Sequence, residues 1–136
     1  MNDLEEKNEL DTRYEVLKIA LQEQNLSDFR ENFLELHIYE QGQFYESLTE
    51  KERAQMYSYL SPKELADMFD SLEEDEDALK EYLEEMRPSY AAAMLSAMYT
   101  DNAVDLLNLL GKKDTAKYLS LMSPEAAAEI KELLHY

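Results

Sequence analysis

Residues 48–72 read LTEKERAQMYSYLSPKELADMFDSL, which is one pattern of twelve residues written twice and closed by a third leucine. Leu48, Leu60 and Leu72 mark the spacing. After two inserted residues in the acidic segment 73–77, the same spacing of twelve resumes at Met86, Met98, Leu110, Met122 and Leu134. An internal repeat of this kind predicts a row of equivalent structural units.

Each repeat has the pattern of one short amphipathic helix. The eighth and ninth residues after each anchor are mostly apolar, as in Met68-Phe69 and Leu106-Leu107, and form a stripe along one helix face. The sixth residue is small, which predicts close approach of neighbouring helices, at Ala54, Ala66, Ala92, Val104, Ala116 and Ala128.

Helix start signals recur in the same phase. Thr49 with Glu52, and Ser61 with Glu64, form capping boxes. Proline occupies the first helical position at Pro62, Pro88 and Pro124. Helices of about ten residues are roughly 15 Å long and are not stable alone in water. We therefore predict an all-α fold, a superhelical array of short helices with two-residue turns over residues 48–136.

The region before the repeat is also predicted to be helical. Residues 1–24 have apolar residues at helical spacing, and Asn25 interrupts the pattern. Ser27 is the predicted N-cap of a short helix, and residues 37–42 are predicted to be a connection, so residues 25–47 link the two regions. We expect one all-helical domain over residues 1–136.

Composition restricts the partners. The net charge is −18, from 31 acidic and 13 basic residues, a field that repels nucleic-acid phosphates and anionic lipid. Cations and basic protein surfaces are the expected partners. The chain has no cysteine, hence no disulfide framework. It shows neither a secretory signal at its start nor an apolar run long enough to span a membrane.

The sequence offers no recognisable catalytic site, so we expect no enzyme. The only histidines, His37 and His135, lie far apart in sequence; we interpret His37 as a packing or capping residue and His135 as favourable for a helix C-terminus. The segment 70–81 has the length of an EF-hand loop but has Leu72 and Asp75 at its third and sixth positions. We interpret it as a solvated loop.

One pair of carboxylates stands out. Asp101 and Asp105 are spaced i, i+4 and have no lysine or arginine three or four residues away. Their Cβ atoms would lie about 5–6 Å apart on one helix face, a mildly unfavourable arrangement. Two interpretations remain open. Asp101 can simply interact with a helix N-terminus, or the pair can attract a cation.

Residues from about 37 to 136 resemble the cytoplasmic N domain of MgtE-type magnesium transporters and channels. The resemblance rests on the short-helix repeat and on segments 60–67, 98–107 and 127–136. It implies that this domain is followed by CBS domains and a transmembrane pore, in a protein of the bacterial cell membrane whose full-length form is a homodimer. This fragment would be a soluble part on the cytoplasmic side, without direct membrane contact.

The resemblance also implies a function. In the family, Mg²⁺ lies between the N domain and the CBS domains and is held by carboxylates from both sides; the matching positions here are Asp67, Asp101 and Asp105. We therefore expect a sensor of intracellular Mg²⁺ that gates the pore and binds the ion only weakly by itself. For Asp67 the alternative is an ion pair with Lys63. For the whole chain it is an acidic protein-interaction scaffold, similar to flagellar motor switch repeats.

Overall fold

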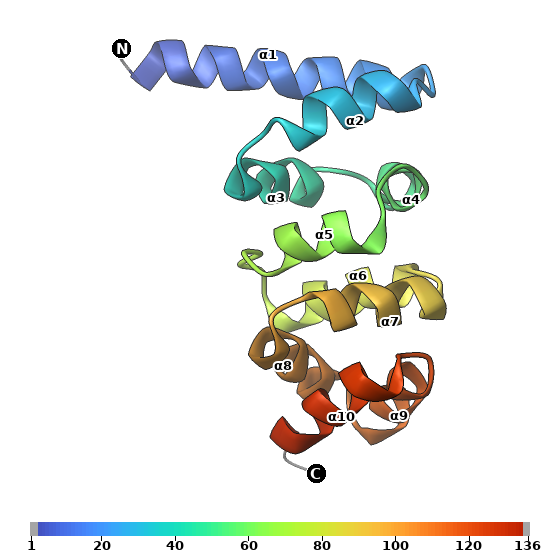
Figure 1. Cartoon of the computed structure of the whole chain (residues 1–136). Helices are drawn as coiled ribbons and strands as arrows, with labels where there is room; N and C mark the ends of the chain where they lie inside the picture. The colour runs from blue at the N-terminus through green and yellow to red at the C-terminus, as the bar shows by residue number, and fades with distance from the viewer. Residues whose placement is uncertain (1–2, 135–136) are drawn as a thin grey trace. The chain divides into compact units, whose positions relative to one another are not determined.

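The computed structural model describes residues 3–134, and within them ten helices and no strand are found (Figure 1). The predicted all-α class is confirmed. The chain divides into two compact units between Leu60 and Ser61. The prediction of one domain over residues 1–136 stays a prediction, and His135 lies outside the described residues.

The helices are short after the first one. The unit that ends at Leu60 contains α1 (Asp3–Gln22), α2 (Leu26–Leu34), α3 (Ile38–Glu46) and α4 (Glu50–Tyr59). The unit that begins at Ser61 contains α5 (Pro62–Phe69), α6 (Glu76–Glu85), α7 (Pro88–Ala97), α8 (Thr100–Leu110), α9 (Lys112–Ser120) and α10 (Pro124–Leu133).

Most helix starts follow the predicted chemistry. Thr49 and Ser61 begin α4 and α5 with complete capping boxes, and α5, α7 and α10 have proline in the first turn. Two predictions for residues 25–47 were wrong, and the first concerns the start of α2. The N-cap of α2 is Asn25 rather than Ser27, because the amide oxygen of Asn25 accepts from the N–H of Asp28 at 3.1 Å.

The segment 37–42 is a helix start and not a connection. His37 is the N-cap of α3: its Nδ1 accepts from the Tyr39 N–H at 3.2 Å, and its own N–H donates to Glu40 at 3.2 Å. The capping interpretation of His37 is thereby confirmed. Gly42 is buried inside α3 and does not interrupt the helix.

The repeat determines which side chains are buried, but in a slightly different phase from the predicted one. Ala66, Ala92 and Val104 are buried at the sixth position, whereas Ala54, Ala116 and Ala128 are exposed. The fifth and eighth positions are buried in every twelve-residue repeat from Leu48 on. The residues at the fifth position are Arg53, Leu65, Ala91, Ala103, Thr115 and Ala127, and those at the eighth position are Met56, Met68, Met94, Leu106, Tyr118 and Ile130.

Polar residues at the fifth position also satisfy the ends of preceding helices. The Thr115 hydroxyl donates to the Leu107 carbonyl at 3.0 Å, and Arg53 donates to the Leu48 carbonyl at 2.7 Å. Gln41 donates to the carbonyls of Phe33 and Leu36. Helix C-termini leave carbonyl groups without intrahelical partners. Gln41 shows that the repeat begins one unit earlier than expected, at Leu36.

The acidic segment 70–81 is only partly a loop. Residues 76–81 belong to α6, whose N-cap is Asp75: the Asp75 carboxylate accepts from the Ala78 N–H at 2.8 Å. Carboxylates at a helix start are favourable because they complement the unpaired N–H groups there. The solvated-loop prediction therefore fails for the second half of the segment.

In the first unit, α1 packs on the short helices through one face. Leu17, Ala20 and Leu21 are buried, and the Tyr14 hydroxyl donates to the Glu40 carbonyl at 2.9 Å. Four aromatic rings from α1, α2 and α3 pack together, and the centroids of the contacting rings are 5.3 to 6.4 Å apart. These are the rings of Tyr14, Phe29, Phe33 and Phe44.

In the second unit, most contacts between helices join a helix to the second helix after it along the chain. The pairs α5 with α7, α6 with α8, α7 with α9, and α8 with α10 pack against each other. The small residues Ala66, Ala91 and Ala92 are fully buried and permit the close approach of α5 and α7. None of the described helices is long and apolar enough to cross a membrane.

Candidate functional site

The helix α8 presents Asp101 and Asp105 on its exposed side. Its opposite side is buried through Ala103, Val104, Leu106, Leu107 and Leu110. This division follows from the amphipathic pattern, since the repeat requires the apolar side to pack and leaves the other side to solvent. The two predicted residues therefore lie one turn apart on one accessible face.

No lysine, arginine or histidine forms an ion pair with either carboxylate in the part of the chain that the structure describes. Asp101 accepts a hydrogen bond from the N–H of Asn102 at 3.1 Å. Both interpretations of Asp101 therefore stay open, since it interacts with the helix start and is also accessible to a cation.

Asp67 lies on another helix. It is exposed on α5, between the buried pairs Leu65-Ala66 and Met68-Phe69. Within the described residues it forms no ion pair with Lys63, so the alternative interpretation for Asp67 does not hold in this structure.

The start of α8 is capped from a distance by Asp70, which the sequence reasoning missed. In α3, α4 and α5 a glutamate at the third helical position accepts from the N–H of the N-cap residue. In α8 that position is Asn102, and the N-cap Tyr99 makes no side-chain capping bond. The Asp70 carboxylate instead accepts from the Tyr99 N–H at 3.1 and 3.3 Å and from Asn102 Nδ2 at 3.0 Å.

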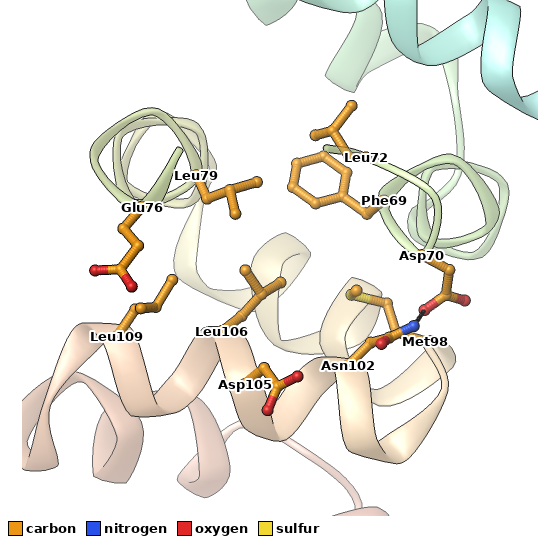
Figure 2. Close-up of a pocket in the computed structure, with 10 residues that line it drawn as sticks. All are labelled: Phe69, Asp70, Leu72, Glu76, Leu79, Met98, Asn102, Asp105, Leu106 and Leu109. Carbon is orange, nitrogen blue, oxygen red and sulfur yellow. Dashed lines mark hydrogen bonds between the residues drawn. The ribbon is translucent and has the colours of Figure 1, made fainter. Parts of the chain in front are cut away.

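A cavity of about 290 Å³ lies between the end of α5, α6 and α8 (Figure 2). Its polar lining consists of Asp70, Glu76, Asn102 and Asp105. The apolar wall is formed by Phe69, Leu72, Leu79, Met98, Leu106 and Leu109. No lysine, arginine or histidine is among its lining residues.

The arrangement suits part of a magnesium site. Mg²⁺ prefers oxygen ligands, keeps several waters and is often held by one or two carboxylates. Among the described residues, no three His, Asp or Glu side chains lie close enough to hold a metal ion. The structure brings Asp101 and Asp105 onto one face, whereas Asp67 is connected to them only through its neighbour Asp70. Two of the three predicted ligands thus share one accessible face.

Comparisons with known proteins show what the chain is similar to. The family model described as MgtE intracellular N domain matches residues 36–136, beginning at the first repeat anchor, Leu36. The magnesium transporter MgtE of Enterococcus faecalis is 63% identical over 133 residues, which cover 98% of this chain and 29% of the relative.

A solved structure is similar as well. The crystal structure of the soluble part of a magnesium transporter is 64% identical, with a TM-score of 0.88, over 93% of this chain and 50% of that one. The chain thus spans less than a third of the transporter and half of the solved protein. The family model, the relative and the structural match agree, and the chain belongs to the family of MgtE intracellular N domains.

Proposed function

We propose that this chain is the magnesium-responsive regulatory domain of a magnesium transporter. Asp67, Asp101 and Asp105 take Mg²⁺ together with carboxylates of CBS domains that follow in the same polypeptide, on the cytoplasmic side of the membrane. The role is regulatory and not catalytic. The full-length protein works as a homodimer.

The observation that carries this proposal is the exposed Asp101 and Asp105 pair on α8. Two like charges one turn apart destabilise a helix slightly, and within the described residues no basic side chain forms an ion pair with them. A divalent cation removes this repulsion. The incomplete donor set favours weak binding by the domain alone and tighter binding when a second acidic surface completes the coordination.

The mechanism follows from charge. At a net charge of −18, the domain repels any other acidic surface at low magnesium. When Mg²⁺ is abundant, Asp101 and Asp105 share it with the facing surface, and the two domains associate and bias the pore closed. The ion shifts the equilibrium by its greater affinity for the associated state.

The test uses a chain in which this domain is joined to its CBS domains. Asp101→Asn with Asp105→Asn should reduce the magnesium-dependent protection against protease several-fold. The matched control, Glu125→Gln with Glu129→Gln, removes two charges at the same i, i+4 spacing from the exposed side of α10 and should leave protection unchanged.

Equal protection in all three proteins would contradict the proposal. Salt-sensitive binding of a basic protein that is indifferent to Mg²⁺ would then favour the interaction-scaffold function.

A further inference from the structure

We infer that Asp70 is the positioning residue of the magnesium-responsive carboxylates, an inference that rests on the function proposed above. Asp70 is the C-cap residue of α5. It is separated from Tyr99 by 29 residues, yet its carboxylate accepts from the Tyr99 N–H and from Asn102 Nδ2. It therefore completes the start of a helix to which it does not belong.

The position of Asp70 connects the segments that carry the three predicted ligands. Asp67 lies three residues earlier, at the spacing of side chains that neighbour each other on a helix face. On the other side, Asp70 contacts Asn102, which lies next to Asp101 and three residues before Asp105. The hydrogen bonds between Asp70 and α8 thus hold the end of α5 against the first turn of α8.

Both carboxylate oxygens of Asp70 are already engaged by the protein. Oδ1 accepts from Tyr99 at 3.1 Å and from Asn102 at 3.0 Å, and Oδ2 accepts from Tyr99 at 3.3 Å. Bonds from N–H groups to a carboxylate are among the stronger hydrogen bonds in proteins. Asp70 therefore acts by orienting α8, while Asp101 and Asp105 stay accessible to the ion.

Preorganisation explains why this contact affects affinity. A site whose ligands are fixed before binding loses less conformational entropy when the ion arrives. If Asp70 releases α8, the first turn of the helix frays and Asp101 must be ordered by the ion itself. Magnesium affinity should fall even though no ligand has been removed.

The experiment compares three variants of the full chain. Asp70→Asn removes the negative charge and replaces one of the two acceptor oxygens by an NH2 donor. Asn102→Ala removes one donor to Asp70 without changing the net charge. Asp75→Asn is the matched control: it removes the same charge at the start of α6, where the amide oxygen of asparagine can still accept the N-cap bond. For each we would follow hydrogen exchange of the Tyr99 amide, and the shifts of the Asp101 and Asp105 amide resonances during titration with MgCl₂ at constant ionic strength.

We expect Asp70→Asn to accelerate exchange at Tyr99 about tenfold and to weaken magnesium binding about three- to tenfold. Asn102→Ala should have a smaller effect in the same direction, and Asp75→Asn should change affinity less than about twofold. Faster exchange with unchanged affinity would overturn the inference. So would an equal loss of affinity in Asp70→Asn and Asp75→Asn, which would indicate a simple charge effect.

The same titration separates this inference from the proposed function. If Asp101→Asn with Asp105→Asn leaves the magnesium-induced shifts unchanged, the proposed function fails, and the role of Asp70 fails with it. If that double variant abolishes the shifts while Asp70→Asn and Asn102→Ala bind Mg²⁺ as the unaltered chain does, only the role of Asp70 is overturned.

Discussion

Individual small residues determine how closely the helices of the second unit approach. Ala92 is 0% exposed and lies on α7, which packs against α5. A larger side chain at such a position forces neighbouring groups out of their preferred conformations. The neighbouring residue Ala93 is exposed on the same helix, so the two alanines differ mainly in burial.

We predict that Ala92→Leu lowers the free energy of unfolding by about 1–3 kcal/mol through overpacking. Urea denaturation followed by circular dichroism measures the change. Ala93→Leu is the control and should change it by less than about 0.5 kcal/mol. Similar losses in both variants would show that the cause is leucine in this helix and not the close packing of α7.

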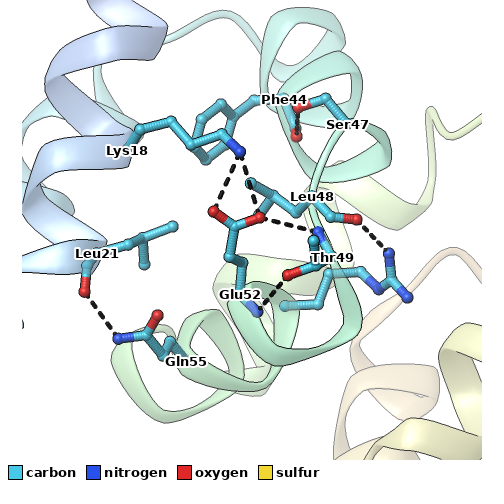
Figure 3. Close-up of polar contacts among 9 residues, drawn as sticks. Lys18, Leu21, Phe44, Ser47, Leu48, Thr49, Glu52 and Gln55 are labelled. Atoms are coloured by element: carbon cyan, nitrogen blue, oxygen red, sulfur yellow. Dashed lines mark hydrogen bonds and ion pairs between the residues drawn. The ribbon is translucent and has the colours of Figure 1, made fainter.

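At the scale of the element, capping boxes decide where helices begin, and one of them also connects two helices. Glu52 accepts from the Thr49 N–H at 2.9 Å in the capping box of α4. The same carboxylate accepts from Lys18 Nζ of α1 at 3.1 and 3.2 Å (Figure 3). Nearby, Gln55 Nε2 donates to the Leu21 carbonyl at 2.9 Å, so α4 holds the end of α1 at two points.

The pKa of Glu52 reflects these contacts. Partial burial by itself raises the pKa, but the hydrogen bonds from Thr49 and the ammonium group of Lys18 outweigh burial and lower it below the usual 4.5. Since the folded-state pKa is lowered, the stabilisation is fully present above pH 4.5 and is lost as the pH falls through the folded-state value.

We therefore predict that Glu52→Gln destabilises the chain by about 1–2 kcal/mol at neutral pH and flattens the fall in stability on acidification below pH 4.5. Thermal unfolding across this range measures both effects. Glu50→Gln removes the same charge from an exposed position of the same helix and should retain the acid dependence. A Glu52→Gln curve parallel to that of the unaltered chain would contradict the assignment.

What the sequence could predict at this scale depends on distance along the chain. The capping boxes at Thr49 and Ser61 involve residues three apart, so the local sequence specifies them. The helix α3 was missed because Gly42 and the surrounding polar residues resemble a break, whereas packing of Phe44 and Tyr45 in the core overrides that local preference. The cap from Asp70 joins residues 29 and 32 positions apart, and no local pattern predicts such a bond.

For the candidate site the same distinction applies. The accessible face of α8 could be predicted, because the repeat fixes which side of each helix is buried. The absence of Asp70 from the predicted site has a physical cause. Its role depends on how the end of α5 meets α8, and the only local sign was the lack of a capping residue at Tyr99 together with Asn102 in place of a glutamate.

At the scale of the whole molecule, tyrosines in both units respond to alkaline pH. Burial and the carboxylates of Glu40 and Asp11 raise the pKa of Tyr14 to about 12. Burial, with Glu64, raises the pKa of Tyr90, and burial, with Asp114 and Glu84, raises that of Tyr118. Because the folded state disfavours the phenolate, the contribution of these tyrosines to stability should be constant below pH 10 and fall as the pH rises above it.

We predict that Tyr14→Phe removes part of this alkaline loss, up to about pH 12, while lowering stability at neutral pH by about 0.5–1.5 kcal/mol through loss of the bond to Glu40. Thermal unfolding as a function of pH measures both. Tyr99→Phe, at a side chain that is 72% exposed, serves as the control and should keep the alkaline loss. An unchanged slope in Tyr14→Phe would exclude Tyr14 as a contributor.

The packing of alternate helices in the second unit has a consequence for how such a protein can grow. Because α5 packs on α7 and α6 on α8, these helices are fitted to their second neighbours, and α8 in addition packs on the adjacent helices α7 and α9. Duplicating a single helix would shift these alternate pairings by one helix, whereas duplicating two at once would keep them. Genes for proteins of this architecture should therefore lengthen or shorten in steps of two helices.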